Sequence, residues 1–194
     1  MGVYIAEVNF PEQGIWVVAV RSSIGSRPAA GYSGVKVTSG EIPGAIGSKA
    51  ISVPTPVATN DARLKEICTR TPVCHLHSIA LDDALKSGKP TVACFATPLL
   101  CQSQLCGPVL DEAILVAEKH GSKANFIHVE EFLPGPDHKP PPADAQHQSP
   151  AFKAWHLLTE PWVFVIDRKG IIRGRLGPGP VVAPVIEQAL QPLL

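Results

Sequence analysis

The chain has 194 residues with 17 basic and 17 acidic side chains, so its formal net charge at pH 7 is zero when histidine is neutral. This balance gives no electrostatic footprint, and no basic patch argues for binding to nucleic acid or to an anionic membrane. No apolar run approaches the ~20 residues of a membrane span, and the N-terminus lacks signal-peptide features. We therefore expect a globular chain of one or two domains, with no compartment encoded.

The first forty residues are predicted to be a β-rich segment. Residues 2–10, 14–21 and 33–38 are rich in β-forming residues and are separated by turn-forming stretches, which indicates a small antiparallel meander. Three short strands bury little surface, so we expect them to contact the rest of the chain or another chain. The segment resembles the closing strands of an immunoglobulin-like sandwich. That resemblance implies an N-terminally truncated chain and favours an extracytoplasmic location.

Residues 41–66 are predicted to form a linker, because Pro and Gly interrupt most of this stretch. Cys68 and Cys74 follow, and a turn at Pro72 would bring their thiols together as a second disulfide. A loop this short would contribute about 2 to 3 kcal/mol without catalysing. With His75 and His77 the same cysteines offer ligands for zinc or copper, but the spacing matches no strong zinc signature. No metal ligand and no cofactor is therefore assigned.

The C-terminal half shows a regular order of predicted elements. Residues 91–96 form a short apolar run typical of a buried strand, and Cys94 inside it is expected to be inert. Apolar residues then recur with helical spacing between Pro108 and Gly121. Further predicted elements are a parallel strand, a Pro-rich exposed insertion, a helical turn, a two-stranded hairpin and a last helix, at residues 126–129, 134–150, 152–158, 162–176 and 182–193.

Cys101 and Cys106 lie between the first strand and the helix. The N-terminus of a helix favours anions, and the thiolate is the nucleophile of disulfide exchange. On a continuous helix the two side chains would point about 140° apart, so the residues between them must form a loop if the sulfurs are to meet. The sequence therefore predicts a redox-active pair, and a purely structural disulfide is the alternative.

These features resemble the thioredoxin-like superfamily, over residues 67–194 and most clearly from Leu76. Cys106-Gly107-Pro108 is similar to the start of the family's Cys-Gly-Pro-Cys motif, and Glu160-Pro161 stands where the family has its cis-proline loop. The chain departs from the motif because its second cysteine is Cys101, upstream of the usual place. The resemblance implies an α/β fold with a central mixed sheet flanked by helices.

The resemblance also implies a thiol-disulfide oxidoreductase or a redox-active accessory protein. Its catalytic residues would be Cys101 and Cys106, and a protein thiol or disulfide would be its substrate. Cys106 is favoured as the attacking thiol by its place at the helix start, whereas access would favour Cys101. The same resemblance gives the substrate-binding residues as Gly107, Pro108, Glu160 and Pro161.

Three points stay open at the level of sequence. The Glu160 carboxylate would oppose thiolate formation if it lay near the sulfurs, and would do nothing if it pointed into solvent. A copper- or zinc-handling protein is one alternative function, with copper held by Cys101, Cys106 and a histidine such as His128. A non-catalytic interaction module with two structural disulfides is the other.

Overall fold

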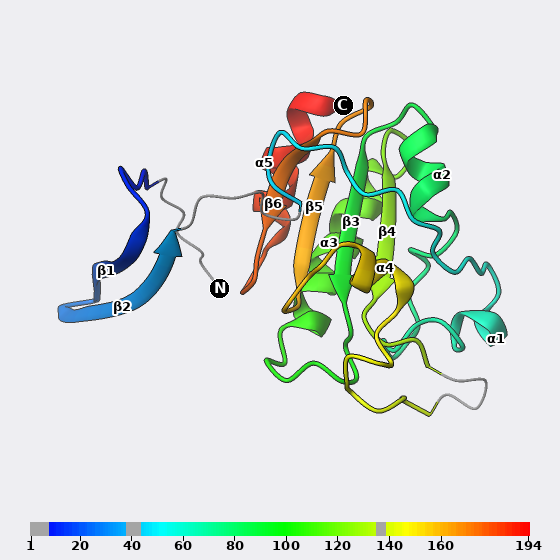
Figure 1. Cartoon of the computed structure of the whole chain (residues 1–194), viewed down its shortest axis with the longest axis horizontal. Coiled ribbons are helices and arrows are strands. Elements are labelled where there is room, and N and C mark those ends of the chain that lie inside the picture. Colours follow the sequence, from blue (N-terminus) through cyan, green and yellow to red (C-terminus); the bar gives the residue numbers. More distant parts are fainter. Residues whose placement is uncertain (1–7, 38–43, 135–138) are drawn as a thin grey trace. The chain divides into compact units, whose positions relative to one another are not determined.

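The computed structural model describes residues 8–37, 44–134 and 139–194, and the chain divides into two compact units at residues 1–42 and 43–194 (Figure 1). The larger unit is a mixed α/β domain and the smaller holds an antiparallel strand pair, as the sequence predicted. Among the described residues, no helix is long and apolar enough to cross a membrane.

The smaller unit is a β-hairpin. Strand β1, Gly14–Ile24, pairs antiparallel with β2, Arg27–Val37. The sequence placed a loop across residues 22–32, and this was wrong because a turn at Gly25, with φ of 63°, already closes the hairpin. The predicted strand at residues 2–10 falls largely outside the described residues, and residues 8–10 form no strand. An immunoglobulin-like origin for this hairpin stays a prediction.

The larger unit contains a four-stranded sheet in the order β4-β3-β5-β6. The central strand β3, Thr91–Ala96, pairs parallel with β4, Asn125–Glu130, and antiparallel with β5, Trp162–Ile166. Strand β6, Ile172–Leu176, completes the predicted hairpin with β5. The sheet is therefore mixed, with one parallel crossover followed by an antiparallel hairpin.

Helices cover both faces of this sheet (Figure 1). Alternate residues of β3 divide between the two faces: Val92 and Cys94 pack with helices α3 and α5, whereas Ala93 and Phe95 pack with α2 and α4. The helix bounds are Asp61–Leu64 for α1, Leu81–Lys86 for α2, Cys106–His120 for α3, Pro150–Ala154 for α4 and Ala183–Leu190 for α5, the last continued by the 3-10 turn η1, Gln191–Leu193.

Helix α3 begins at Cys106, two residues before the predicted start at Pro108. Pro108 thus occupies the third helical position, where the missing N–H costs nothing because first-turn N–H groups have no partner within the helix. This earlier start makes Cys106 the first helical residue, and it turns the Cys106 side chain into the core, where it is fully buried.

The predicted linker at residues 41–66 makes backbone hydrogen bonds with the larger unit where the structure describes it. Lys49 bridges Ile171 next to strand β6, and the Ala50 N–H donates to the Gly170 carbonyl at 2.8 Å. Further along, the Ala58 N–H donates to the His77 carbonyl at 3.0 Å. Residues 44–59 are therefore part of the larger unit, because their backbone groups pair with its edge and its loops.

Gly177 lies close to the backbone of Pro161, and substitution of this glycine tests that contact. Gly177 has φ of 115°, and a Cβ there would lie 2.5 Å from the Pro161 carbonyl oxygen, whereas a Cβ at Gly170, with φ of 78°, would meet nothing within 4 Å. Gly170→Ala should lose roughly 1 to 2 kcal/mol from backbone strain alone. Gly177→Ala should lose more, because the steric overlap adds to that strain. Urea unfolding of both variants measures the difference, and equal losses would contradict the close contact.

Candidate redox site

Cys101 and Cys106 face each other across a reversed loop. The Cys106 N–H donates to the Cys101 Sγ at 3.4 Å, and Gln104, with φ of 59°, supplies the left-handed residue that turns the chain back. Both residues carry free thiols. This is the loop that the sequence required, with Cys106 on the helix and Cys101 ahead of it.

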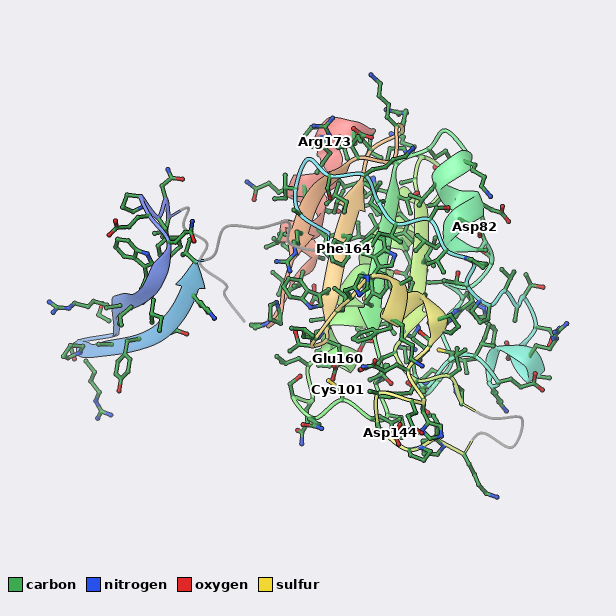
Figure 2. All side chains as sticks on the ribbon, in the orientation of Figure 1. Asp82, Cys101, Asp144, Glu160, Phe164 and Arg173 are labelled. Carbon is green, nitrogen blue, oxygen red and sulfur yellow. The ribbon has the colours of Figure 1, made fainter. Side chains whose placement is uncertain are left out.

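Glu160 and Pro161 lie on the segment that enters strand β5. Their peptide bond is cis, and a Glu160 carboxylate oxygen lies within 4.8 Å of both sulfurs. Figure 2 shows Cys101 and Glu160 together at one end of the larger unit. The side chain of Glu160 is therefore directed at the cysteines and not away from them.

The two thiols differ sharply in electrostatics. Although burial raises the pKa of Cys101, hydrogen bonds from the Cys106 thiol, the Ser103 hydroxyl at 3.2 Å and the Cys106 N–H outweigh it and lower that pKa. The pKa of Cys106 is raised, first by burial and then by its interaction with Cys101 and the charge of Glu160. The geometry therefore favours Cys101 as the thiolate, against the sequence-based preference for Cys106.

Exposure to solvent also favours Cys101 over Cys106 as the reactive thiol. Cys106 is fully buried, whereas Cys101 is half-buried in the loop. The helix N-terminus does stabilise an anion at Cys106, but that benefit is typically 0.3–1 kcal/mol, and burial of a charge costs considerably more. The helix dipole alone favours Cys106, but the first helical position is also buried, and burial acts in the opposite direction.

A cavity of about 360 Å³ opens beside the Cys101 loop. Leu100, Gln102 and Ser103 line one side of it, and Leu158 and Glu160 line another. The Pro-rich insertion supplies a further part of the wall through residues 143–145 and Gln148, and Figure 2 labels Asp144 of this part. The insertion thus borders the loop that carries Cys101, and its residues 142–147 are exposed to solvent.

An acidic pair occupies the wall of this cavity. Burial, together with a hydrogen bond to Glu160, raises the pKa of Glu131 to about 7, although Gln148 donates to its Oε1 at 2.8 Å. Beside these carboxyl groups, Leu158 is 95% exposed. The surface next to Cys101 therefore combines acidic groups with an exposed apolar side chain.

The remaining predicted substrate-binding residues lie around the sulfurs. Gly107 is half-buried, Pro108 is exposed at the start of α3, and Pro161 is buried where its loop meets strand β5. A Cβ at Gly107 would meet no atom within 4 Å, so the surface beside Cys106 is open there. Their part in binding a substrate stays a prediction.

The copper set proposed from sequence does not assemble. Within the part of the chain that the structure describes, the acidic or ligating group gathered with Cys101 and Cys106 is Glu160, and His128 lies elsewhere, with its Nδ1 3.3 Å from the Cys74 Sγ. Cys68 and Cys74 are neighbours as predicted, but as free thiols with sulfurs 3.8 Å apart. Burial raises the pKa of Cys94 to about 12, in keeping with an inert role.

No protein-family model matches the chain. No curated protein matches it either. Among solved structures, it is similar to the pneumococcal exposed lipoprotein thioredoxin of Streptococcus pneumoniae, with 17% identity and a TM-score of 0.42 over 59% of this chain and 91% of that one. A thioredoxin-family thiol:disulfide interchange protein of Chlorobium tepidum has 18% identity and a TM-score of 0.41 over 75% and 99% of the two chains.

A third similar structure is MTB dsbF, in mixed oxidized and reduced forms. It has 18% identity and a TM-score of 0.44 over 69% of this chain and 98% of its own. Structural similarity at this level of identity and TM-score says nothing about the activity of the chain. The function of the present chain is therefore inferred from the geometry of its own sulfurs.

The hydrogen bond from Ser103 predicts a measurable change in Cys101. Ser103→Ala removes a donor to the thiolate, so the pKa of Cys101 should rise and its alkylation should begin at higher pH. Iodoacetamide alkylation of the reduced protein against pH, followed by peptide mapping, measures this. Gln102→Ala is the matched control, because Gln102 is an exposed residue of the same loop. Superimposable profiles for Ser103→Ala and the unmodified protein would show that Ser103 does not tune the thiol.

Proposed function

We propose that the chain is a thiol-disulfide oxidoreductase that acts on protein disulfides through Cys101 and Cys106. The observation that carries this proposal is the asymmetry of the pair: Cys101 is accessible with a lowered pKa, and Cys106 is buried beneath it with a raised one. An attacking thiol must meet substrate as a thiolate, and a resolving thiol must only reach its partner.

The first step forms a mixed disulfide. The Cys101 thiolate attacks one sulfur of the substrate disulfide, so a bond forms between Cys101 and the substrate while the substrate S–S bond breaks. The sulfur that leaves carries the electron pair as a thiolate and takes up a proton from water. The cavity beside Cys101, with exposed Leu158 and the carboxyl group of Glu160, is where we place the substrate segment.

The second step releases the substrate. The Cys106 sulfur attacks the Cys101 sulfur, the bond between Cys101 and the substrate breaks, and the substrate thiolate takes the proton that Cys106 loses. The substrate has gained two electrons and two protons, and the chain holds a Cys101–Cys106 disulfide. A dithiol or a glutathione-type thiol restores the reduced pair, and the same steps in reverse oxidise a substrate.

Glu160 is placed to affect this cycle through Cys106. Its negative charge contributes to the raised pKa of Cys106, so it disfavours the thiolate of the resolving residue. The carboxylate would therefore keep Cys106 protonated until the mixed disulfide has formed. The sequence-based hypothesis that Glu160 opposes thiolate formation is thus retained, but for the buried cysteine.

Single-cysteine variants test the order of attack. Cys106→Ser should accumulate a covalent adduct with protein substrates that contain a disulfide, because Cys101 still attacks and no thiol resolves the mixed disulfide. Insulin supplies the substrate disulfide, and mass spectrometry locates the adduct at Cys101. Cys101→Ser should give no adduct, and neither variant should turn over.

Cys94→Ala is the matched control, since Cys94 is buried in strand β3 and should leave turnover unchanged. An adduct formed through Cys106 in the Cys101→Ser protein would reverse the proposed order of attack. Absence of any adduct from folded Cys106→Ser protein would contradict the enzymatic proposal and favour the non-catalytic module.

A further inference from the structure

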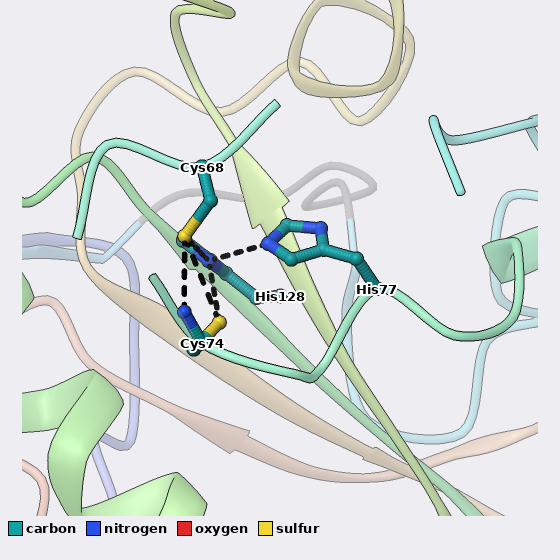
Figure 3. A group of neighbouring side chains, drawn as sticks. All are labelled: Cys68, Cys74, His77 and His128. Carbon is teal, nitrogen blue, oxygen red and sulfur yellow. Dashed lines mark hydrogen bonds between the residues drawn. The ribbon is translucent and has the colours of Figure 1, made fainter. Parts of the chain in front are cut away.

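A second sulfur centre lies apart from the redox pair. Cys68, Cys74, His77 and His128 are 1–4% exposed, and one ligand atom from each lies within 4.8 Å of the other three (Figure 3). The two cysteines and His77 come from the segment between helices α1 and α2, and His128 comes from the middle of strand β4. Four buried thiol and imidazole groups have thus converged from two distant parts of the sequence.

The backbone fixes this convergence. The His128 N–H donates to the Leu76 carbonyl at 2.8 Å, which attaches the loop to strand β4 beside His77. Residues 75–79 form bends and turns, and within them His77 is buried whereas His75 is exposed. His128 therefore replaces His75 in the ligand set that the local sequence offered.

Four of the six distances between the ligand atoms lie close to the edges of a tetrahedral zinc site. With Zn–S of about 2.3 Å and Zn–N of about 2.0–2.1 Å, a regular tetrahedron has edges of about 3.8 Å for S–S, about 3.5 Å for S–N and about 3.3 Å for N–N. The observed separations are 3.8 Å between the two sulfurs, 3.7 and 3.3 Å from the sulfurs to His128 Nδ1, and 3.1 Å from that nitrogen to His77 Nε2.

The contacts of His128 Nε2 leave the lone pair of Nδ1 available to the other three ligand atoms. Its Nε2 lies 3.2 Å from the Ala96 carbonyl oxygen and 3.5 Å from Glu130 Oε1. A carbonyl oxygen can only accept, so Nε2 carries the proton and Nδ1 is free to bind a cation. A histidine that binds zinc through one ring nitrogen usually donates its other ring N–H to a carbonyl or a carboxylate.

Charge and access also suit a divalent cation. The two thiolates balance the charge of Zn²⁺ and the two imidazoles are neutral, which keeps the cost of burying the ion low. Two cavities reach the cluster: one of about 310 Å³ is lined by His77 and His128, and one of about 350 Å³ is lined by Cys68. An ion thus has a route to the four ligands.

We propose that Cys68, Cys74, His77 and His128 bind one zinc ion in a closed structural site. Binding releases two thiol protons, and the four ligands leave no open position for a substrate. The metal would hold residues 68–77, which have little regular structure, against strand β4. This inference does not rest on the proposed redox function, because it involves none of the redox-site residues.

Metal analysis of the whole chain tests the proposal directly. The Cys101→Ser/Cys106→Ser double variant removes the other thiol pair, and it should be purified under reducing conditions without chelator. We expect one zinc per chain, and after exchange with Co²⁺ we expect the visible bands and the thiolate-to-cobalt absorption of a tetrahedral thiolate site. In the zinc-loaded protein, Cys68 and Cys74 should resist alkylation until a chelator removes the metal.

Matched histidine variants then assign the ligands. In that double-variant background His77→Ala should lose stoichiometric zinc, whereas His75→Ala should keep it, because His75 is exposed two residues away. Glu130→Gln should weaken zinc binding by about 10- to 100-fold through His128. If His77→Ala fails to fold, the cobalt spectrum of the parent double variant still decides whether the site exists.

Two results would overturn the proposal. The first is reduced, folded double variant that takes up no zinc and gives no thiolate-to-cobalt band. The second is a Cys68–Cys74 disulfide that persists in protein prepared under reducing conditions with zinc present, which would support the disulfide predicted from sequence. Equal zinc loss in His75→Ala and His77→Ala would likewise contradict the ligand set.

Discussion

The hydrogen bond from the Cys106 N–H to the Cys101 sulfur is the contact on which the redox site depends. It exists because Cys106 is the first residue of α3, whose N–H has no partner within the helix and is free to point back at the loop. The same position buries the Cys106 side chain against the sheet. One backbone geometry thus stabilises an anion at Cys101 and disfavours one at Cys106, which is the difference that the proposed roles require.

The two sulfur centres share a short connecting segment. Thr69 follows Cys68 of the proposed zinc site. The Thr69 hydroxyl donates to Glu130 Oε1 at 2.9 Å and accepts from the Leu99 N–H at 3.3 Å. Leu99 belongs to the loop that leads to Cys101. Next to Thr69, Arg70 pairs with Asp111 of α3 at 2.8 Å. A metal that ordered residues 68–77 would therefore also support the loop that presents Cys101.

The sequence predicted the features that depend on local periodicity. The run of β-formers at residues 91–96, the helical repeat before Gly121 and the glycine turn at Gly170 each depend on neighbouring residues, and all three elements are present. Strands β1 and β2 are longer than the sequence predicted. Ser, Gly and Pro have a weak β propensity, but pairing across the tight turn outweighs it.

What the sequence could not predict depends on long-range placement. His128 lies 54 residues beyond Cys74, and only the pairing of β3 with β4 and the docking of the Leu76 loop bring it to the cysteines. Likewise, the preference for Cys106 as nucleophile ignored burial, which requires knowledge of what covers the helix start. Both misses concern sulfur chemistry, because thiol reactivity is set by surroundings more than by spacing.

Equilibration of the wild-type protein with graded glutathione buffers tests the central claim most directly. After rapid alkylation, peptide mapping gives the fraction of Cys101 and Cys106 that is oxidised at each potential. A redox-active pair should show a single two-electron transition linking these two cysteines, at a potential above about −300 mV. A Cys101–Cys106 disulfide that stays oxidised at every potential down to about −300 mV, as structural disulfides do, would contradict the account, and so would a pair that stays reduced throughout.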